Sequence, residues 1–257
     1  ATVLFFYFNI LYHMLQKYMA FLYYDAGEKK KLTGRKKATM KESSGRVFSI
    51  ALDNAPVKGC TVSKTVSTEN GYYISVFSLA NGTDISAESY SYHKMLLMAD
   101  GEMAVTDHTG EREQLGKGDL YITPKDVPTG AATKNGCVYL EITLKEDSKM
   151  NEILQAGQVF ALKELIPYQE GKIVNMDLVN EKNLKFVLMS FTAQTALSEH
   201  AAPAQALLFA LDGEAVIGYE GKEYVLHAGE NFKFEKGGKH YVKAAQNFKM
   251  ALLLTFE

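Results

Sequence analysis

From about residue 47 onward, hydrophobic and polar residues alternate over short runs that are separated by turn sequences such as Asn-Gly, Asp-Gly and Thr-Gly. Alternation with a period of two is typical of strands that bury one face, and closely spaced turns are typical of sandwiches and barrels. In the first part of this region the strand-like runs cover residues 74–79, 94–98, 102–106 and 119–123. The pattern therefore predicts an all-β fold.

One stretch departs from this alternation. Residues 145–166, KEDSKMNEILQAGQVFALKELI, mix charged and apolar side chains at helical spacing, and Gly157 interrupts them. We expect a short helix here, within a linker over residues 151–170.

A search for internal repeats divides the β region into two copies. When the chain is shifted by 112 residues, ADGEMAV (99–105) falls on LDGEAVI (211–217). After a gap of one residue, GEREQLGKGD (110–119) falls on GKEYVLHAGE (221–230). Each copy reads as strands joined by glycine turns, as in a double-sheet jelly roll. The repeat predicts two β-barrels in tandem, over residues 47–150 and 171–257.

Residues 1–46 precede the first copy as a leader whose nativeness is open. The stretch LFFYFNILYHMLQKYMAFLYY (4–24) is long enough to span a membrane, but polar residues such as His13 and Lys17 interrupt it. Two interpretations remain. Either the natural chain starts at Met40 and the residues before it are translated leader sequence, or the segment is an amphipathic helix that lies on a membrane surface or binds a partner.

Composition narrows the functional classes. With 28 basic and 30 acidic side chains the net charge is −2, so no global field favours nucleic acid or an anionic membrane surface. Cys60 and Cys137 are the only cysteines, and without a recognisable secretory signal they are better read as reduced thiols than as a disulfide. We therefore expect a cytoplasmic protein that binds neither nucleic acid nor a membrane. The sequence also lacks dinucleotide-binding, phosphate-loop, nucleophile-elbow and zinc-metalloprotease motifs.

The second copy carries two motifs that resemble those of the cupins. LSEHAAPAQALLFALDGEAVI (197–217) is similar to the first cupin motif, and HAGENFKFEKGGKHYVKAAQNFKMALLLTF (227–256) to the second. The resemblance covers about residues 47–257 and is, more narrowly, to the two-domain (bicupin) proteins of bacteria whose function is uncharacterised. It implies two tandem cupin jelly-roll β-barrels with a short linker helix. In this family the two motifs supply histidines and an acidic residue that hold a divalent metal inside the barrel.

Carried over by position, the metal motif of the second copy is partial. His200 stands at the first histidine position, Ala202 at the second, Gln205 near the acidic position and His240 at the last histidine position. The resemblance thus implies a metal and ligand site of His200, Gln205 and His240, beside which the cation Lys239 suits a carboxylate or enolate ligand. Because a neutral amide replaces the carboxylate, we expect one divalent transition metal (Zn, Ni, Fe or Mn) to be weakly held.

The first copy offers no comparable set. Glu88, Tyr90, His93 or Lys94, and Thr129 stand at the corresponding positions. We expect Glu88, Tyr90 and Thr129 to line the first barrel without holding an ion.

Two function classes remain open. The first is a small-molecule-binding bicupin without turnover, which has a weak or vestigial metal site in its C-terminal barrel. The second is a metal-dependent enzyme of oxygenase or isomerase type that acts on a small carboxylate or enolate substrate. The partial ligand set favours the first class. We also expect the two barrels to pair with each other within the chain, with a homodimer as a further assembly that the fold allows.

Overall fold

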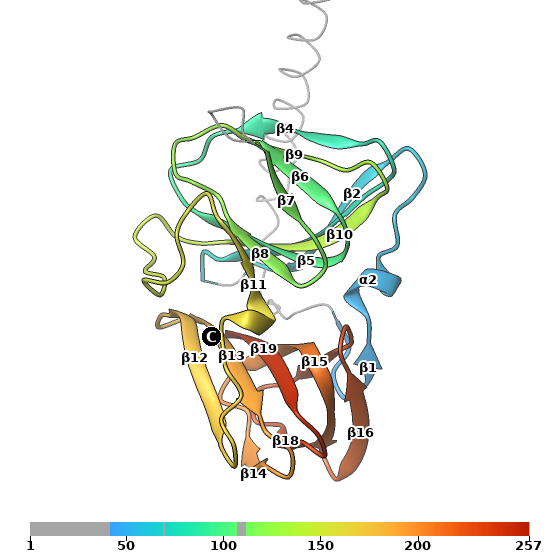
Figure 1. Cartoon of the computed structure of the whole chain (residues 1–257), viewed down its shortest axis with the longest axis vertical. Coiled ribbons are helices and arrows are strands. Elements are labelled where there is room, and N and C mark those ends of the chain that lie inside the picture. Colours follow the sequence, from blue (N-terminus) through green and yellow to red (C-terminus); the bar gives the residue numbers. More distant parts are fainter. Residues whose placement is uncertain (1–41, 69, 107–111, 257) are drawn as a thin grey trace, which may run out of the picture. The chain divides into compact units, whose positions relative to one another are not determined.

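The computed structural model describes residues 42–68, 70–106 and 112–256 (Figure 1). Within these ranges the only helical pieces are the one-turn helix α2 (Ile50–Asp53) and the 3-10 turn η1 (Leu162–Glu164), and strands make up most of the rest. This confirms the all-β prediction. No helix in these ranges is long and apolar enough to cross a membrane. The aromatic stretch of the leader lies outside the described residues.

The N-terminal half consists of two antiparallel sheets. One has six strands in the order β11-β8-β5-β10-β3-β2, and the other has four in the order β4-β9-β6-β7. The strands are β2 (Thr61–Ser67), β3 (Tyr73–Leu79), β4 (Asp84–Glu88), β5 (Lys94–Gly101), β6 (Met103–Thr106), β7 (Arg112–Leu115), β8 (Asp119–Ile122), β9 (Thr129–Ala132), β10 (Cys137–Thr143) and β11 (Val159–Ala161).

The C-terminal half is one continuous nine-stranded arrangement. Its main path has the order β1-β17-β15-β19-β13-β12, and β14, β18 and β16 attach to it through the long strand β15. The strands are β1 (Val47–Phe48), β12 (Ile173–Asn180), β13 (Leu184–Phe191), β14 (Ala196–Ala201), β15 (Gln205–Tyr219), β16 (Lys222–His227), β17 (Asn231–Phe234), β18 (Lys239–Lys243) and β19 (Phe248–Thr255). None of the sheets formed by the described residues closes on itself.

The two halves share one strand order. The path β8-β5-β10-β3 of the N-terminal half corresponds to β17-β15-β19-β13 of the C-terminal half. Strand β15 pairs with β17 and β19 along its first part and with β16 and β18 along its second, whereas the N-terminal half divides the same path between β5 and β6. The internal repeat of the sequence is therefore visible in the topology.

Each half receives one short strand from the segment that precedes the other half along the chain. β1 lies before the N-terminal half but pairs with β17, and β11 lies before the C-terminal half but pairs with β8. Figure 1 shows the blue β1 among the orange and red strands, and the yellow β11 beside the green β8. The exchange is reciprocal, so one of the two edge strands of each main sheet belongs to a segment that the sequence assigns elsewhere.

Three hydrophobic clusters account for the core. One fills the interior of the N-terminal half, between its two sheets, and a second fills the interior of the C-terminal half. The third and most extensive, here termed the interface core, takes side chains from both halves. Its members include Ile74, Val76, Leu97, Leu140 and Ile142 from the N-terminal half and Leu184, Phe186, Leu188, Leu207, Phe209 and Leu253 from the C-terminal half.

The predicted linker helix is not present. Residues 151–170 contain β11 and η1 instead, and Gly157 adopts a positive φ of 83°. The apolar side chains that suggested a helical face, Leu154, Leu162 and Ile166, are buried in the interface core. Pairing with β8 and burial between the halves outweigh the local helical preference of this segment.

Candidate functional site

The two motif histidines lie side by side in the C-terminal half. His200 on β14 and His240 on β18 are direct cross-strand partners, and their ring centroids are 4.2 Å apart. His240 is buried, with 7% of its surface exposed. Its ring centroid lies 4.3 Å from that of Phe234, which belongs to the hydrophobic cluster inside the C-terminal half, here termed the interior core. His200 is exposed. We term these two residues the histidine pair, which reaches from the interior to the solvent.

A β-bulge makes this pairing possible. β14 pairs with β18 at Leu197 and Val242 and again at the histidine pair, and between these points Ser198 and Glu199 lie opposite the single residue Tyr241. The extra residue reverses the alternation of β14, so the histidine falls on the same face as Leu197. Glu199 lies close enough to Tyr241 for its charge to affect the tyrosine. A hydrogen bond to Glu223 is the main cause that raises the pKa of Tyr241, and the charge of Glu199 raises it further. Glu199 therefore does not replace the missing acidic ligand.

The hydrogen bonds of both rings leave one nitrogen of each available. Nδ1 of His200 lies 2.9 Å from the carbonyl oxygen of Ser198, and Nδ1 of His240 lies 3.2 Å from that of Gly238. A carbonyl oxygen only accepts, so each Nδ1 carries the proton and donates it. In the neutral rings both Nε2 atoms then hold a lone pair. Metal-binding histidines are oriented in the same way, by donating their other N–H to a backbone carbonyl.

Burial lowers the pKa of His240 from its usual 6.5. The hydrogen bond to the Gly238 carbonyl partly opposes this, and the neighbouring His200 adds a still smaller lowering. His240 is therefore neutral in the folded protein at pH values where it is already protonated in the unfolded chain.

Acidification is therefore expected to destabilise the fold through His240. As pH falls below about 6.5, the unfolded chain binds a proton that the folded protein does not, so the free energy of unfolding decreases down to the folded pKa. In His240→Gln this contribution is absent, and stability should depend less on pH. Urea unfolding of both proteins at several pH values between neutral and mildly acidic measures the effect. Equal pH dependence in the two proteins would contradict it.

The structure does not bring Gln205 to the histidine pair. Gln205 pairs with Thr255, and it lies on the same face of β15 as Leu207 and Phe209, which belong to the interface core. The alternate residues of β15, such as Leu208, belong to the interior core that contains Phe234. Because adjacent side chains of a strand point to opposite faces, Gln205 faces the N-terminal half. Of the predicted set, the structure brings His200 and His240 together and places Gln205 on the other face of its sheet.

Lys239 is also turned away from the pair. It precedes His240 on β18, is exposed, and its backbone N–H donates to Oε1 of Glu220 at 2.7 Å. Neighbours on a strand alternate between faces, so the Lys239 ammonium lies on the outer side. Among the residues that the structure describes, no group of three or more His, Cys, Asp or Glu side chains could hold a metal ion. The C-terminal half thus offers two imidazole nitrogens, where stable zinc sites use three or four protein ligands.

The N-terminal half has a cavity of about 150 Å³ in its interior, which we term the N-terminal cup. Glu88, Tyr90 and Thr129, which the repeat placed at the positions of the metal motif, all line it, as does Lys94. The Tyr90 hydroxyl donates to the Glu88 carboxylate. The ammonium of Lys94 lies 3.9 Å above the Tyr90 ring. The cup is therefore lined by polar groups that are already paired with each other.

Sequence reasoning missed one member of this cup. Glu141 on β10 pairs with Lys94, with 3.2 Å between Oε1 and Nζ, and both side chains are largely buried. Burial raises the pKa of Glu141, and the Lys94 charge opposes this rise. The sequence did contain a signal for Glu141, since it is the one charged residue in the apolar run VYLEITL. Strands rarely bury an unpaired carboxylate, so this position indicates a buried partner of opposite charge.

The two cysteines differ in their exposure to solvent. Both are free, with Cys60 exposed and Cys137 buried. Burial raises the pKa of Cys137 to about 11, so its thiol stays protonated at neutral pH and is a poor nucleophile.

Comparison with known proteins supports the cupin resemblance. Residues 187–256 match the family model of the cupin domain. A cupin 2 conserved barrel domain protein from Leptotrichia buccalis has a similar structure, with a TM-score of 0.74 and 27% sequence identity over 85% of this chain and 100% of that chain. Oxalate decarboxylase from Bacillus subtilis aligns with a TM-score of 0.48 and 14% identity over 86% of this chain and 78% of that chain, which is too distant for any inference. No curated protein matches the sequence.

The matched region contains the histidine pair, and the similar structure extends over both halves of the chain. The comparisons therefore support a cupin fold for the chain and a cupin domain over residues 187–256.

Proposed function

We propose that the protein is a small-molecule-binding bicupin, with two jelly-roll halves in tandem, whose C-terminal half holds one divalent transition metal weakly through His200 and His240. The observation that carries this proposal is the cross-strand histidine pair, with both Nδ1 atoms bonded to backbone carbonyls and both Nε2 atoms left to a ligand. Imidazole nitrogen suits Zn, Ni and Fe better than Mn, which prefers oxygen donors.

Two protein ligands leave most of the coordination sphere to water or to a bound small molecule. A metal in this position would supply a Lewis acid for an oxygen atom of that molecule, such as a carboxylate or enolate oxygen. Since the exposed His200 stands at the solvent side and the buried His240 at the interior side, the ligand would enter past His200. The enzyme alternative needs a further protein ligand that the described residues do not provide near the pair. The free cysteines fit a reducing cytoplasm.

Calorimetric titration with Zn, Ni and Mn tests the proposal. The wild type is expected to bind weakly, and His240→Ala to lose the binding. Ala202→His adds an imidazole at a buried position of the interior core and is expected to tighten binding by about tenfold, for a gain of about 1.4 kcal/mol. Lys239→Ala serves as the matched control and should bind as the wild type does. Equal heats in the wild type and His240→Ala would overturn the site.

The same titration distinguishes the two placements of Gln205. If Gln205 were a ligand, Gln205→Glu would add a charge and tighten binding. Because its side chain faces the interface core, we expect Gln205→Glu to leave metal affinity unchanged.

A further inference from the structure

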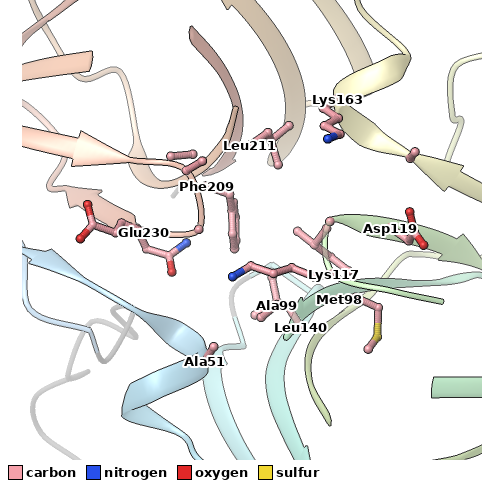
Figure 2. Close-up of a pocket in the computed structure, with 17 residues that line it drawn as sticks. Ala51, Met98, Ala99, Lys117, Asp119, Leu140, Lys163, Phe209, Leu211 and Glu230 are labelled. Carbon is pink, nitrogen blue, oxygen red and sulfur yellow. The ribbon is translucent and has the colours of Figure 1, made fainter. Parts of the chain in front are cut away.

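A second cavity, of about 280 Å³, lies between the two halves (Figure 2). It contains neither member of the histidine pair and shares no residue with the N-terminal cup. Its walls come from β5, the β7–β8 turn, β10, β11 and η1 on one side, and from α2, β15 and the β16–β17 turn on the other.

The cavity is built from corresponding parts of the internal repeat. Residues 97–99 on β5 and 209–211 on β15, which are 112 positions apart, both line it. So do the turns at residues 117–119 and 228–230. Small residues occupy much of the wall, and the space remains open because no larger side chain fills it. These small residues are Ala51, Ala99, Gly118, Ala161, Ala210, Ala228 and Gly229.

The body of the cavity is apolar. Leu97, Leu140 and Phe209 are buried, and all three line it together with the partly buried Leu211. Such walls suit a hydrocarbon or aromatic group, because removing apolar surface from water is worth about 25 cal/mol for each Å².

Two carboxylates at the edge are already satisfied. Oε2 of Glu230 accepts from the backbone N–H and the ring of His227, at 2.8 and 3.1 Å. Oδ2 of Asp119 accepts from the backbone N–H of Gly116 at 2.8 Å. Figure 2 shows the Glu230 carboxylate turned away from Phe209. Both carboxylates keep their negative charge, but these hydrogen bonds hold one oxygen of each on His227 and Gly116.

Two lysines contribute ammonium groups at the cavity, and one of them takes part in a long, exposed ion pair. The nearest carboxylate recorded for Lys117 is that of Asp100 at 3.8 Å, and both side chains are more than half exposed. The Lys117 ammonium crosses to the other half, since it lies 3.0 Å from where a Cβ on Gly229 would stand. Within the described part of the chain, no ion pair or hydrogen bond holds the ammonium of Lys163.

We infer that this cavity binds a small amphipathic anion, a monocarboxylate with an apolar body, whose carboxylate lies at Lys117 and Lys163 and whose body packs on Phe209 and Leu97. Its volume is near the lower end of the range of ligand pockets, about 300–1,000 Å³, which suits a small acid rather than a nucleotide cofactor. Because both halves form the walls, a bound anion stabilises their packing against each other and raises the thermal midpoint. The inference does not depend on the histidine pair.

Titration of the full chain with octanoate tests this site, by calorimetry and by thermal unfolding. Octanoate is expected to bind and to raise the midpoint, whereas acetate, which lacks the apolar body, and octan-1-ol, which lacks the charge, should do so far less. In the double variant Lys117→Met/Lys163→Met, octanoate affinity should fall by about tenfold or more, since each 1.4 kcal/mol is tenfold. Lys222→Met, which removes an exposed lysine of β16 outside the cavity, is the matched control and should bind as the wild type does.

A second variant fills the cavity instead of changing its charge. Ala51→Leu places a larger side chain in the wall, and we expect it to abolish octanoate binding while the unliganded protein unfolds as before. Absence of any heat or midpoint shift with octanoate would overturn the inference. So would unchanged binding in both the double lysine variant and Ala51→Leu, and equal binding of octan-1-ol would overturn the role of the two lysines.

Discussion

Expressed as separate chains, residues 40–150 and 158–257 are expected not to fold as independent monomers, and to form a heterodimer when they are mixed. The interface core takes large apolar side chains from both halves, among them Leu140, Phe186 and Leu253, each less than 1% exposed. Leaving one such side chain in water costs about 1.5–3 kcal/mol. The cost for about five such side chains is comparable to the free energy of unfolding of a typical domain, about 5–15 kcal/mol.

The exchanged strands strengthen this expectation. The first fragment lacks β11, which pairs with its own β8, and the second lacks β1, which pairs with its own β17. Each fragment therefore carries the edge strand that the other needs. Size-exclusion chromatography and circular dichroism of the fragments, alone and mixed, measure the outcome. If each fragment were a folded monomer and neither bound the other, the interface core would not hold the halves together.

Gly213→Ala is expected to destabilise the protein by about 4 kcal/mol or more, a loss typical only of severe core or backbone defects. Gly213 has a φ of 69°, and a Cβ there would lie 1.9 Å from the carbonyl oxygen of Asn247. The main-chain conformation itself is unfavourable for alanine by about 1–2 kcal/mol. The clash adds to this, because Asn247 directly precedes β19 and its backbone cannot move aside without disturbing the pairing of Phe248 with Gly213.

Gly221→Ala is the matched control for this prediction. Gly221 has a similar φ of 76°, but a Cβ there would meet nothing within 4 Å. It should therefore lose only the conformational contribution of about 1–2 kcal/mol. Denaturant unfolding of the two variants and the wild type gives both values. If the two variants were equally stable, the close approach at Gly213 would be without consequence.

The same constraint explains why the repeat is clearest at Asp-Gly-Glu. Gly101 is the counterpart of Gly213 in the first copy, with a φ of 78° and a Cβ position 2.3 Å from the carbonyl oxygen of Gly136. In both halves the strand pairing shifts register close to this glycine. Both copies therefore need glycine at the point where the path bends from one sheet to the next, and the sequence shows it twice.

For the site, the resemblance to the cupin motifs implied two histidines that the fold brings together, and the structure places His200 and His240 as cross-strand partners. The bulge at Ser198 and Glu199 that sets their common face has no signature in the sequence. The hydrophobic pattern also did not determine to which side of the sheet the Gln205 side chain points. β15 begins QALLFA, and it is apolar on both sides because one face packs on the interior core and the other on the interface core.

The sequence by itself determined the all-β class, the repeat of 112 residues and the glycines at its bends, because these depend on local alternation and on conformations that one residue must adopt. Only the tertiary structure decided the exchange of β1 and β11, the absence of the linker helix and the side on which Gln205 lies. These features depend on which strands meet and on apolar surface buried between the halves. Burial acts through distant contacts, which an alternating pattern does not record.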